Sequence, residues 1–232
     1  MSTALFDPVE LKPLRDLCPD ASTSALVTAG VDQYTQDWWT LRLGTPSASS
    51  IDNVVTNTGK KSAGAARKTY LCGLVAERLT RTVEMNHSTP AMERGSNLEP
   101  KARAWYEIDA GRDVLEVGFI FRDEKKDCGC SPDGICADRG LELKCPMRKQ
   151  MINILLGEDV PTGYLGQCQF SMWVTGLPAW DFAVYTPEPE IPNRRWTIER
   201  DEKMMQAYTD YVPAFIAEIG EAVARVKEMR EV

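Results

Sequence analysis

The chain has 232 residues, of which 43% are hydrophobic and 26% charged, and its formal net charge is -7. This length allows one sizeable core and is short for two, so we expect a single domain over residues 1–232. The N-terminus lacks a signal pattern and no run approaches the ~20 apolar residues of a membrane span, so we expect a soluble, cytoplasmic protein. The net acidity argues against a nucleic-acid partner unless the basic residues gather on one surface.

Helices are expected in the first half of the chain. Residues 1–36 lack strong periodicity and are interpreted as an N-terminal segment of one or two short helices packed on the domain. A basic cluster follows in a glycine-, serine- and alanine-rich stretch, where a solvated loop and a DNA contact are about equally favoured. Its members are Lys60, Lys61, Arg67 and Lys68. Apolar spacing then predicts a core helix over 69–84 and another over 98–110, with an inner face made of Leu98, Ala102, Trp105 and Ile108.

From residue 114 the apolar period changes to two. Alternation predicts a strand over 114–122 and two shorter strands over 130–136 and 140–145, joined by a turn at 137–140. The remaining elements are a helix over 164–174, strands over 180–185 and 195–199, and a long C-terminal helix over 201–232 with a possible kink at Pro213. This order predicts an α/β fold with a central mixed β-sheet flanked by helices on both faces.

The pattern richest in chemistry is Pro132-Asp133, followed by Glu142-Leu143-Lys144. Side chains alternate along a strand, so Glu142 and Lys144 project from the same face. If the preceding strand is antiparallel, Asp133 comes alongside Glu142. Two carboxylates about 4 Å apart repel by roughly 1 to 4 kcal/mol, so a cation must balance them.

Oxygen ligands with few histidines nearby favour magnesium, with manganese able to substitute, and the Leu143 carbonyl could add a ligand. A plain salt bridge between Glu142 and Lys144 beside a turn aspartate is the competing structural interpretation. The seven cysteines are expected to be free thiols, because their number is odd and no CxxC pair occurs. We therefore expect neither zinc nor an iron–sulfur cluster, although four cysteines fall close together at Cys128, Cys130, Cys136 and Cys145.

Longer strings strengthen the pattern. They are Leu-Arg-Leu-Gly at 41–44 with Ala48-Ser49, Cys-Ser-Pro-Asp-Gly at 130–134, Leu-Glu-Leu-Lys-Cys-Pro at 141–146, Gln-Phe-Ser-Met-Trp-Val-Thr at 169–175 and Ile-Glu-Arg-Asp-Glu-Lys at 198–203. In this order they resemble the lambda exonuclease family of YqaJ-like viral recombinase nucleases, within the PD-(D/E)xK superfamily. The resemblance covers a nuclease core from about residue 37 to 220.

The resemblance implies a restriction-endonuclease-like core and a ring-shaped homotrimer around DNA. It implies a magnesium-dependent, processive 5′→3′ exonuclease that releases 5′-mononucleotides from linear duplex DNA with a 5′-phosphate. The 3′ overhang left behind would serve phage-type recombination with a single-strand annealing protein in a bacterial host. A structure- or site-specific endonuclease of the same superfamily stays open. So does a non-catalytic DNA-binding module in which the four clustered cysteines hold a metal.

Site roles follow from the resemblance residue by residue. Asp133, Glu142 and the Leu143 carbonyl would bind magnesium, and Lys144 would orient or help deprotonate the attacking water. Glu99 would reach a second metal, although the following Pro100 puts its helical position in doubt.

The remaining carried-over roles concern the nucleophile and the DNA. Gln167 would position the water, with Tyr164 one helical turn earlier. Arg42 and Ser49 would hold the 5′-phosphate, and Lys60 and Lys61 would contact DNA. The chain lacks the family's strand-separating arginine before Gly59, so other residues would have to part the strands. His87 is interpreted as a solvated loop residue.

Overall fold

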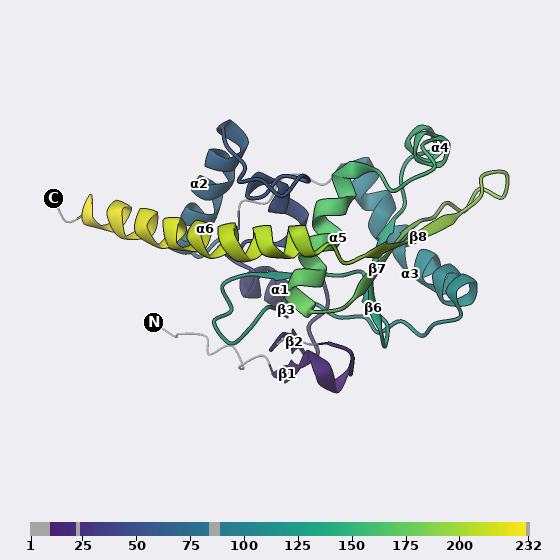
Figure 1. Ribbon diagram of the computed structural model, residues 1–232, viewed down its shortest axis with the longest axis horizontal. Coiled ribbons are helices and arrows are strands. Elements are labelled where there is room, and N and C mark those ends of the chain that lie inside the picture. The colour runs from purple at the N-terminus through teal and green to yellow at the C-terminus, as the bar shows by residue number, and fades with distance from the viewer. Residues whose placement is uncertain (1–9, 22–23, 84–88, 231–232) are drawn as a thin grey trace.

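The computed structural model describes residues 10–21, 24–83 and 89–230; His87 lies outside them. Apart from two short 3-10 turns, the elements are β1 (Leu11–Pro13), β2 (Leu26–Thr28), α1 (Gln36–Leu41), α2 (Ala65–Thr80), α3 (Pro90–Ala110), β3 (Ile120–Phe121), β4 (Gly129–Cys130), β5 (Gly134–Ile135), β6 (Arg139–Lys144), α4 (Arg148–Leu156), α5 (Thr162–Thr175), β7 (Ala179–Val184), β8 (Arg194–Glu199) and α6 (Glu202–Glu228). Figure 1 shows α5 and α6 crossing the body of the protein, with α6 extending away from it toward the C-terminus.

Within the described residues, the strands form two four-stranded sheets. Strands β1 to β4 follow one another in an antiparallel sheet, and β5 to β8 form a mixed sheet in which only β6 and β7 are parallel. β7 is buried along its whole length, which is why its sequence, Ala-Trp-Asp-Phe-Ala-Val, is almost continuously apolar. The predicted central mixed sheet is therefore confirmed.

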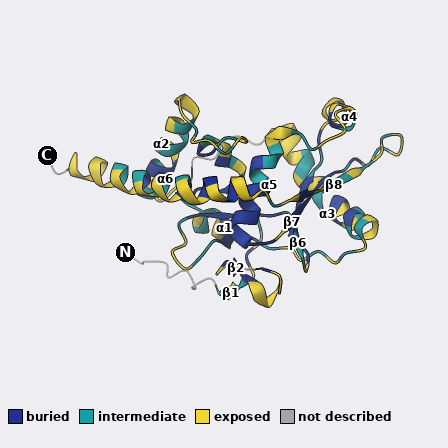
Figure 2. Cartoon of the chain, viewed as in Figure 1, coloured by how far each residue is buried: buried dark blue, intermediate teal, exposed yellow. Residues whose placement is uncertain are grey.

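Helices cover both faces of the mixed sheet, as expected. Leu141, Leu143 and Ala183 pack against Ala102 and Tyr106 of α3. The alternate β7 side chains join the larger core that α5 and α6 help to form; they are Trp180, Phe182 and Val184. Figure 2 shows the buried residues gathered along the sheet and the inner part of α6, while the far end of α6 is exposed. Gly140 lies where any Cβ would run into the Trp180 ring, so the sheet requires glycine there.

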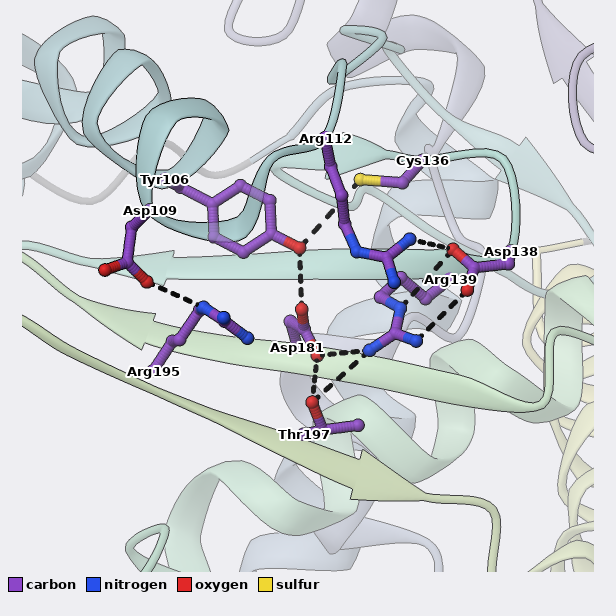
Figure 3. A network of polar contacts seen from close by, with 9 residues as sticks. All are labelled: Tyr106, Asp109, Arg112, Cys136, Asp138, Arg139, Asp181, Arg195 and Thr197. Atoms are coloured by element: carbon purple, nitrogen blue, oxygen red, sulfur yellow. Dashed lines mark hydrogen bonds and ion pairs between the residues drawn. The ribbon is translucent and has the colours of Figure 1, made fainter.

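A polar network lies on the α3 face of the mixed sheet (Figure 3). Asp181 of β7 is fully buried and accepts hydrogen bonds from the hydroxyls of Tyr106, at 2.6 Å, and Thr197, at 2.7 Å. Arg139 Nη1 lies 3.1 Å from the same carboxylate. Burial and the hydrogen bond to Asp181 raise the pKa of Tyr106, so its hydroxyl stays protonated as a donor. The network thus neutralises a charge inside the sheet and ties α3, β6, β7 and β8 together.

The expectation for the N-terminal segment was wrong. The described part of residues 10–36 contains β1, β2 and a 3-10 turn over 14–16, and α1 begins only at Gln36. β2 pairs with β3, so Leu26 lies opposite Phe121, and strand structure here depends on a partner almost a hundred residues away. Local periodicity could not predict that pairing.

Three other predicted elements differ from the structure. The single strand expected over 130–136 is divided into β4 and β5, which belong to different sheets. The strand over 114–122 shrinks to Ile120–Phe121, because Leu115 bridges to Ile135 of the mixed sheet while Ile120 pairs in the other sheet. In α3 the expected inner residue Ile108 is 85% exposed, and Tyr106, one turn after Ala102, is buried instead.

The other helix predictions hold with shifted ends. α2 runs from 65 to 80 instead of 69–84, and α3 starts eight residues earlier than expected. α3 continues through Pro100, and α6 through Pro213. α4 was not predicted. Within the ranges described, no helix is both long and apolar enough to cross a bilayer.

Candidate active site

Asp133 and Glu142 meet where β5 lies beside β6. Gly134 pairs with Leu141 in an antiparallel ladder, and the Asp133 N–H donates to the Leu141 carbonyl at 3.1 Å. The Asp133 carboxylate accepts a 2.6 Å hydrogen bond from the Leu143 N–H. The N–H and C=O of one strand residue point toward the same edge, so the Leu143 carbonyl faces the side on which Asp133 lies. The antiparallel pairing expected from the sequence is present.

Glu142 and Lys144 project together from β6 toward α5. The Lys144 ammonium bonds Oε1 of Glu142, and its Nζ lies 5.8 Å from the centroid of the Tyr164 ring. Tyr164 in turn stacks on Phe182 of β7. Gln167, one turn later on α5, is close enough to Glu142 to lower its pKa. The structure thus brings together four of the predicted residues: Glu142, Lys144, Tyr164 and Gln167.

Burial dominates the electrostatics of these groups. It raises the pKa of both Asp133 and Glu142, and the neighbouring Lys144 acts in the opposite direction. For Lys144, burial lowers the pKa, but the charges of Glu142 and Asp133 more than offset this and raise it. Lys144 is therefore a cation while it pairs with Glu142 and cannot accept a proton in that state.

Glu99 lies inside α3, in spite of Pro100. It shares a pocket of about 190 Å³ with Asp133, Tyr34 and Arg103. Arg103 binds the Glu99 carboxylate at 2.8 Å and also donates to the Asp133 carbonyl at 3.3 Å. Burial, followed by the charge of Asp133, raises the pKa of Glu99 to about 7.

The donor set fits a hard divalent cation. Oε2 of Glu142 is buried and has no hydrogen-bond partner among the described residues, and the Asp133 carboxylate and the Leu143 carbonyl lie beside β6. Within residues 10–21, 24–83 and 89–230, no three His, Cys, Asp or Glu side chains are clustered so as to hold a metal. A cation here would thus rest on two carboxylates and a carbonyl, with water completing its shell, as magnesium commonly does.

Arg42 is linked through Trp38 to Ser131, two residues before Asp133. Its guanidinium is 4.3 Å from the centroid of the Trp38 ring, and Trp38 Nε1 donates to Ser131 Oγ at 3.1 Å. Arg42 Nη2 contacts the Ser47 hydroxyl at 3.2 Å. The predicted partner Ser49 is exposed, two residues further along.

The predicted basic cluster is divided between pairing and exposure. Lys61 and Arg67 both pair with Glu218 of α6, at 3.5 and 2.7 Å. Lys60 and Lys68 are exposed. Two of the four cations thus share one carboxylate, which weakens the case for Lys61 as a DNA contact more than the case for Lys60.

Sequence patterns predicted no role for several residues of the pocket, among them Gln33, Tyr34 and Arg103. Gln33 and Tyr34 come from the segment interpreted as helical, and Arg103 lies one turn after Glu99. Gln33 Nε2 donates to the Pro132 carbonyl at 2.7 Å, which fixes the N-terminal segment against the Pro-Asp turn. Of these contacts, only the one between Glu99 and Arg103 could have been predicted from the sequence, because the two residues are spaced to lie on one face of a helix.

The raised pKa of Glu99 predicts how stability depends on pH. A carboxyl group whose pKa is raised in the folded state contributes fully to stability at pH values below its unfolded-state pKa, here 4.5. That contribution is lost as the pH rises to about 7, the pKa in the folded state. Metal-free protein in EDTA should lose on the order of 2 kcal/mol from this group between pH 5 and 8. Melting temperatures should show the loss, and Glu99→Gln should reduce it. The exposed control Glu221→Gln should not; equal pH profiles for the two variants would contradict the assignment.

A mixed sheet flanked by helices, with two carboxylates and a lysine on and beside its strand β6, is the restriction-endonuclease-like fold of nucleases. The model of the YqaJ-like viral recombinase domain matches residues 37–178. The chain belongs to this family, which confirms the resemblance found in its motifs.

Similar proteins agree with this assignment. The crystal structure of LHK-Exo in complex with dAMP has a TM-score of 0.77 and 34% identity, covering 85% of this chain and 98% of that one. An alkaline exonuclease structure, LHK-Exo from Laribacter hongkongensis, gives 0.77 and 33% over the same shares. A phage-related exonuclease from Haemophilus somnus 129PT, at 12% identity and TM-score 0.58 over 78% of this chain and 96% of that one, shares the fold. ExoD of Escherichia coli K12 is 40% identical over 70 residues, which are 30% of this chain and 80% of ExoD.

Proposed function

We propose that the protein is a magnesium-dependent exonuclease that digests one strand of linear duplex DNA from its 5′ end and releases 5′-mononucleotides. The observation that carries this proposal is the meeting of Asp133, Glu142 and Lys144 beside β6, in a chain of the YqaJ-like family. The exonuclease relatives, one of them solved with a mononucleotide, dAMP, support the reaction and the form of its product.

The residues on and around β6 would have different roles in the reaction. Asp133, Glu142 and the Leu143 carbonyl would hold magnesium, which when bound supplies Lewis-acid activation of water and phosphate oxygens. The Lys144 ammonium holds Glu142 in place and adds positive charge that stabilises the transferring phosphoryl group. Gln167 orients the carboxylate and the attacking water, and Tyr164 packs beside Lys144. Glu99 would contribute at a second metal, once it exchanges its contact with Arg103.

The biological setting is part of the proposal and rests on family membership. The exonuclease would act as a homotrimer that encircles DNA, work processively in the cytoplasm of a bacterial host, and leave a 3′ overhang. A single-strand annealing protein would take up that overhang. Lys60 and Ser49, both exposed, are available to contact the DNA backbone.

The direct test is digestion of end-labelled DNA with magnesium and with EDTA. The expected result is magnesium-dependent release of labelled mononucleotide from the 5′ end of linear duplex, with a closed circular duplex left intact. Cutting of the circle would instead indicate an endonuclease of the same superfamily. Release from the 3′ end would contradict the polarity.

Arg42 should determine the preference for phosphorylated ends. Its guanidinium can bind a terminal phosphate through two parallel hydrogen bonds, which a lysine would not reproduce. Arg42→Ala should lower kcat/KM on 5′-phosphorylated duplex by roughly tenfold to a hundredfold, the range for a charge-assisted contact, and change digestion of 5′-hydroxyl duplex little. Arg148→Ala, an exposed arginine on α4, is the control. An undiminished preference for phosphorylated ends in Arg42→Ala would remove this residue from the pocket.

A further inference from the structure

Tyr34 has an unusual backbone conformation at the edge of the candidate site. Its φ is 66°, in the left-handed region that is unfavourable for a bulky side chain. The side chain is nevertheless large and 57% exposed. Strained residues persist where the surrounding structure holds them, and they concentrate at sites of binding and catalysis. An exposed tyrosine held in this way invites a functional explanation.

The position of Tyr34 connects two parts of the site. Its ring centroid lies 5.3 Å from that of Trp38, and the Arg42 guanidinium packs over the Trp38 ring. On the other side, Tyr34 lines the pocket that contains Glu99 and Asp133. Burial and the nearby charges of Asp133 and Glu99 raise its pKa, so its hydroxyl is uncharged at neutral pH. A neutral aromatic ring thus stands between an arginine and a pair of carboxylates.

We propose that Tyr34 is a nucleotide-binding residue, whose ring stacks on the base of the 5′-terminal nucleotide. This inference rests on the proposed exonuclease function. A nucleotide about to be removed has its 5′-phosphate at Arg42 and its scissile phosphate at Asp133, so its base and sugar occupy the space between them. Stacking on an aromatic ring tolerates every base, as an enzyme that digests any sequence requires.

The variants Tyr34→Phe and Tyr34→Gly separate the ring from the backbone. Glycine accepts a positive φ without strain, so Tyr34→Gly should keep its Tm while KM for 5′-phosphorylated linear duplex rises about tenfold, the size of one lost stacking contact. Tyr34→Phe should retain the wild-type KM. Lys126→Gly is the matched control, because Lys126 has φ 56° in an exposed turn; its KM should not change.

A duplex with an abasic 5′-terminal nucleotide, its phosphate kept, identifies what the ring touches. On this substrate wild type and Tyr34→Gly should have equal KM, since no base remains to stack. Equal KM on ordinary duplex overturns the proposal, and so does a Tyr34→Gly defect that persists on the abasic end. A lowered Tm in Tyr34→Gly, with the KM defect unchanged on both substrates, would mark Tyr34 as structural support for α1. If wild type itself digests no linear duplex, the exonuclease proposal fails, and this one with it.

Discussion

Asp133→Asn should reduce digestion of linear duplex DNA by about a thousandfold, a loss typical of removing one charged group from a catalytic centre. Asparagine retains an oxygen that can accept the Leu143 N–H, so the local fold of β5 and β6 should survive. What disappears is one of the two negative charges that would balance a bound cation. The loss should therefore fall on turnover, with DNA affinity in EDTA largely unchanged, as fluorescence anisotropy would measure.

The control for this variant is Asp210→Asn. Asp210 is exposed on α6 and hydrogen-bonds only Gln206 among the contacts described, so its variant should digest DNA at the wild-type rate. Circular dichroism would establish that both variants fold. Wild-type activity in Asp133→Asn would contradict the site assignment, and a parallel loss of DNA affinity would indicate a role in binding.

Asp181→Ala should destabilise the protein by about 3 kcal/mol, because it leaves the buried Tyr106 hydroxyl without its acceptor and removes one of the two acids that pair with Arg139, the other being Asp138. Asp181 is fully buried, and its removal deprives Arg139, Tyr106 and Thr197 of a shared acceptor (Figure 3). Tyr106 would be affected most, because its hydroxyl is buried and depends on that carboxylate. Urea unfolding would measure the change.

Asp109→Ala gives a matched comparison on the same face of the sheet. Asp109 also pairs with an arginine, Arg195, at 2.7 Å, but both side chains are partly exposed. Exposed pairs contribute about 0 to 1 kcal/mol, so this variant should remain close to wild type. Similar losses in the two variants would mean that burial does not set the importance of Asp181.

The half of the candidate site around Asp133 and Glu142 follows from local sequence. A tight turn over 136–138, close to the predicted 137–140, joins β5 to β6 and places Asp133 beside Glu142, and strand alternation alone puts Lys144 on the same face as Glu142. These relations involve residues within a dozen positions of one another. Tyr164 and Gln167 were added by resemblance, and packing of α5 against β6 and β7 brings them to Lys144.

The other half depends on contacts between distant segments. Tyr34 reaches Asp133 across almost a hundred residues, because Gln33 and Trp38 bind the backbone and side chains around Pro132. Neither contact leaves a periodic signature, and the surrounding segment pairs as β2 with a strand that alternation alone misplaced. The pairing of Lys61 with Glu218 is of the same kind.

The sequence by itself thus placed Asp133, Glu142 and Lys144 together, because strand alternation and a short turn act over a few residues. The order of the elements predicted the mixed sheet, and the resemblance of longer motifs indicated the family. Only the tertiary structure decided which aromatic and basic side chains surround that centre, because it alone fixes how β2, α1 and α3 pack around the Pro-Asp turn. Whether a charge such as that of Asp181 or Lys61 is buried, paired or open to a ligand depends on that packing.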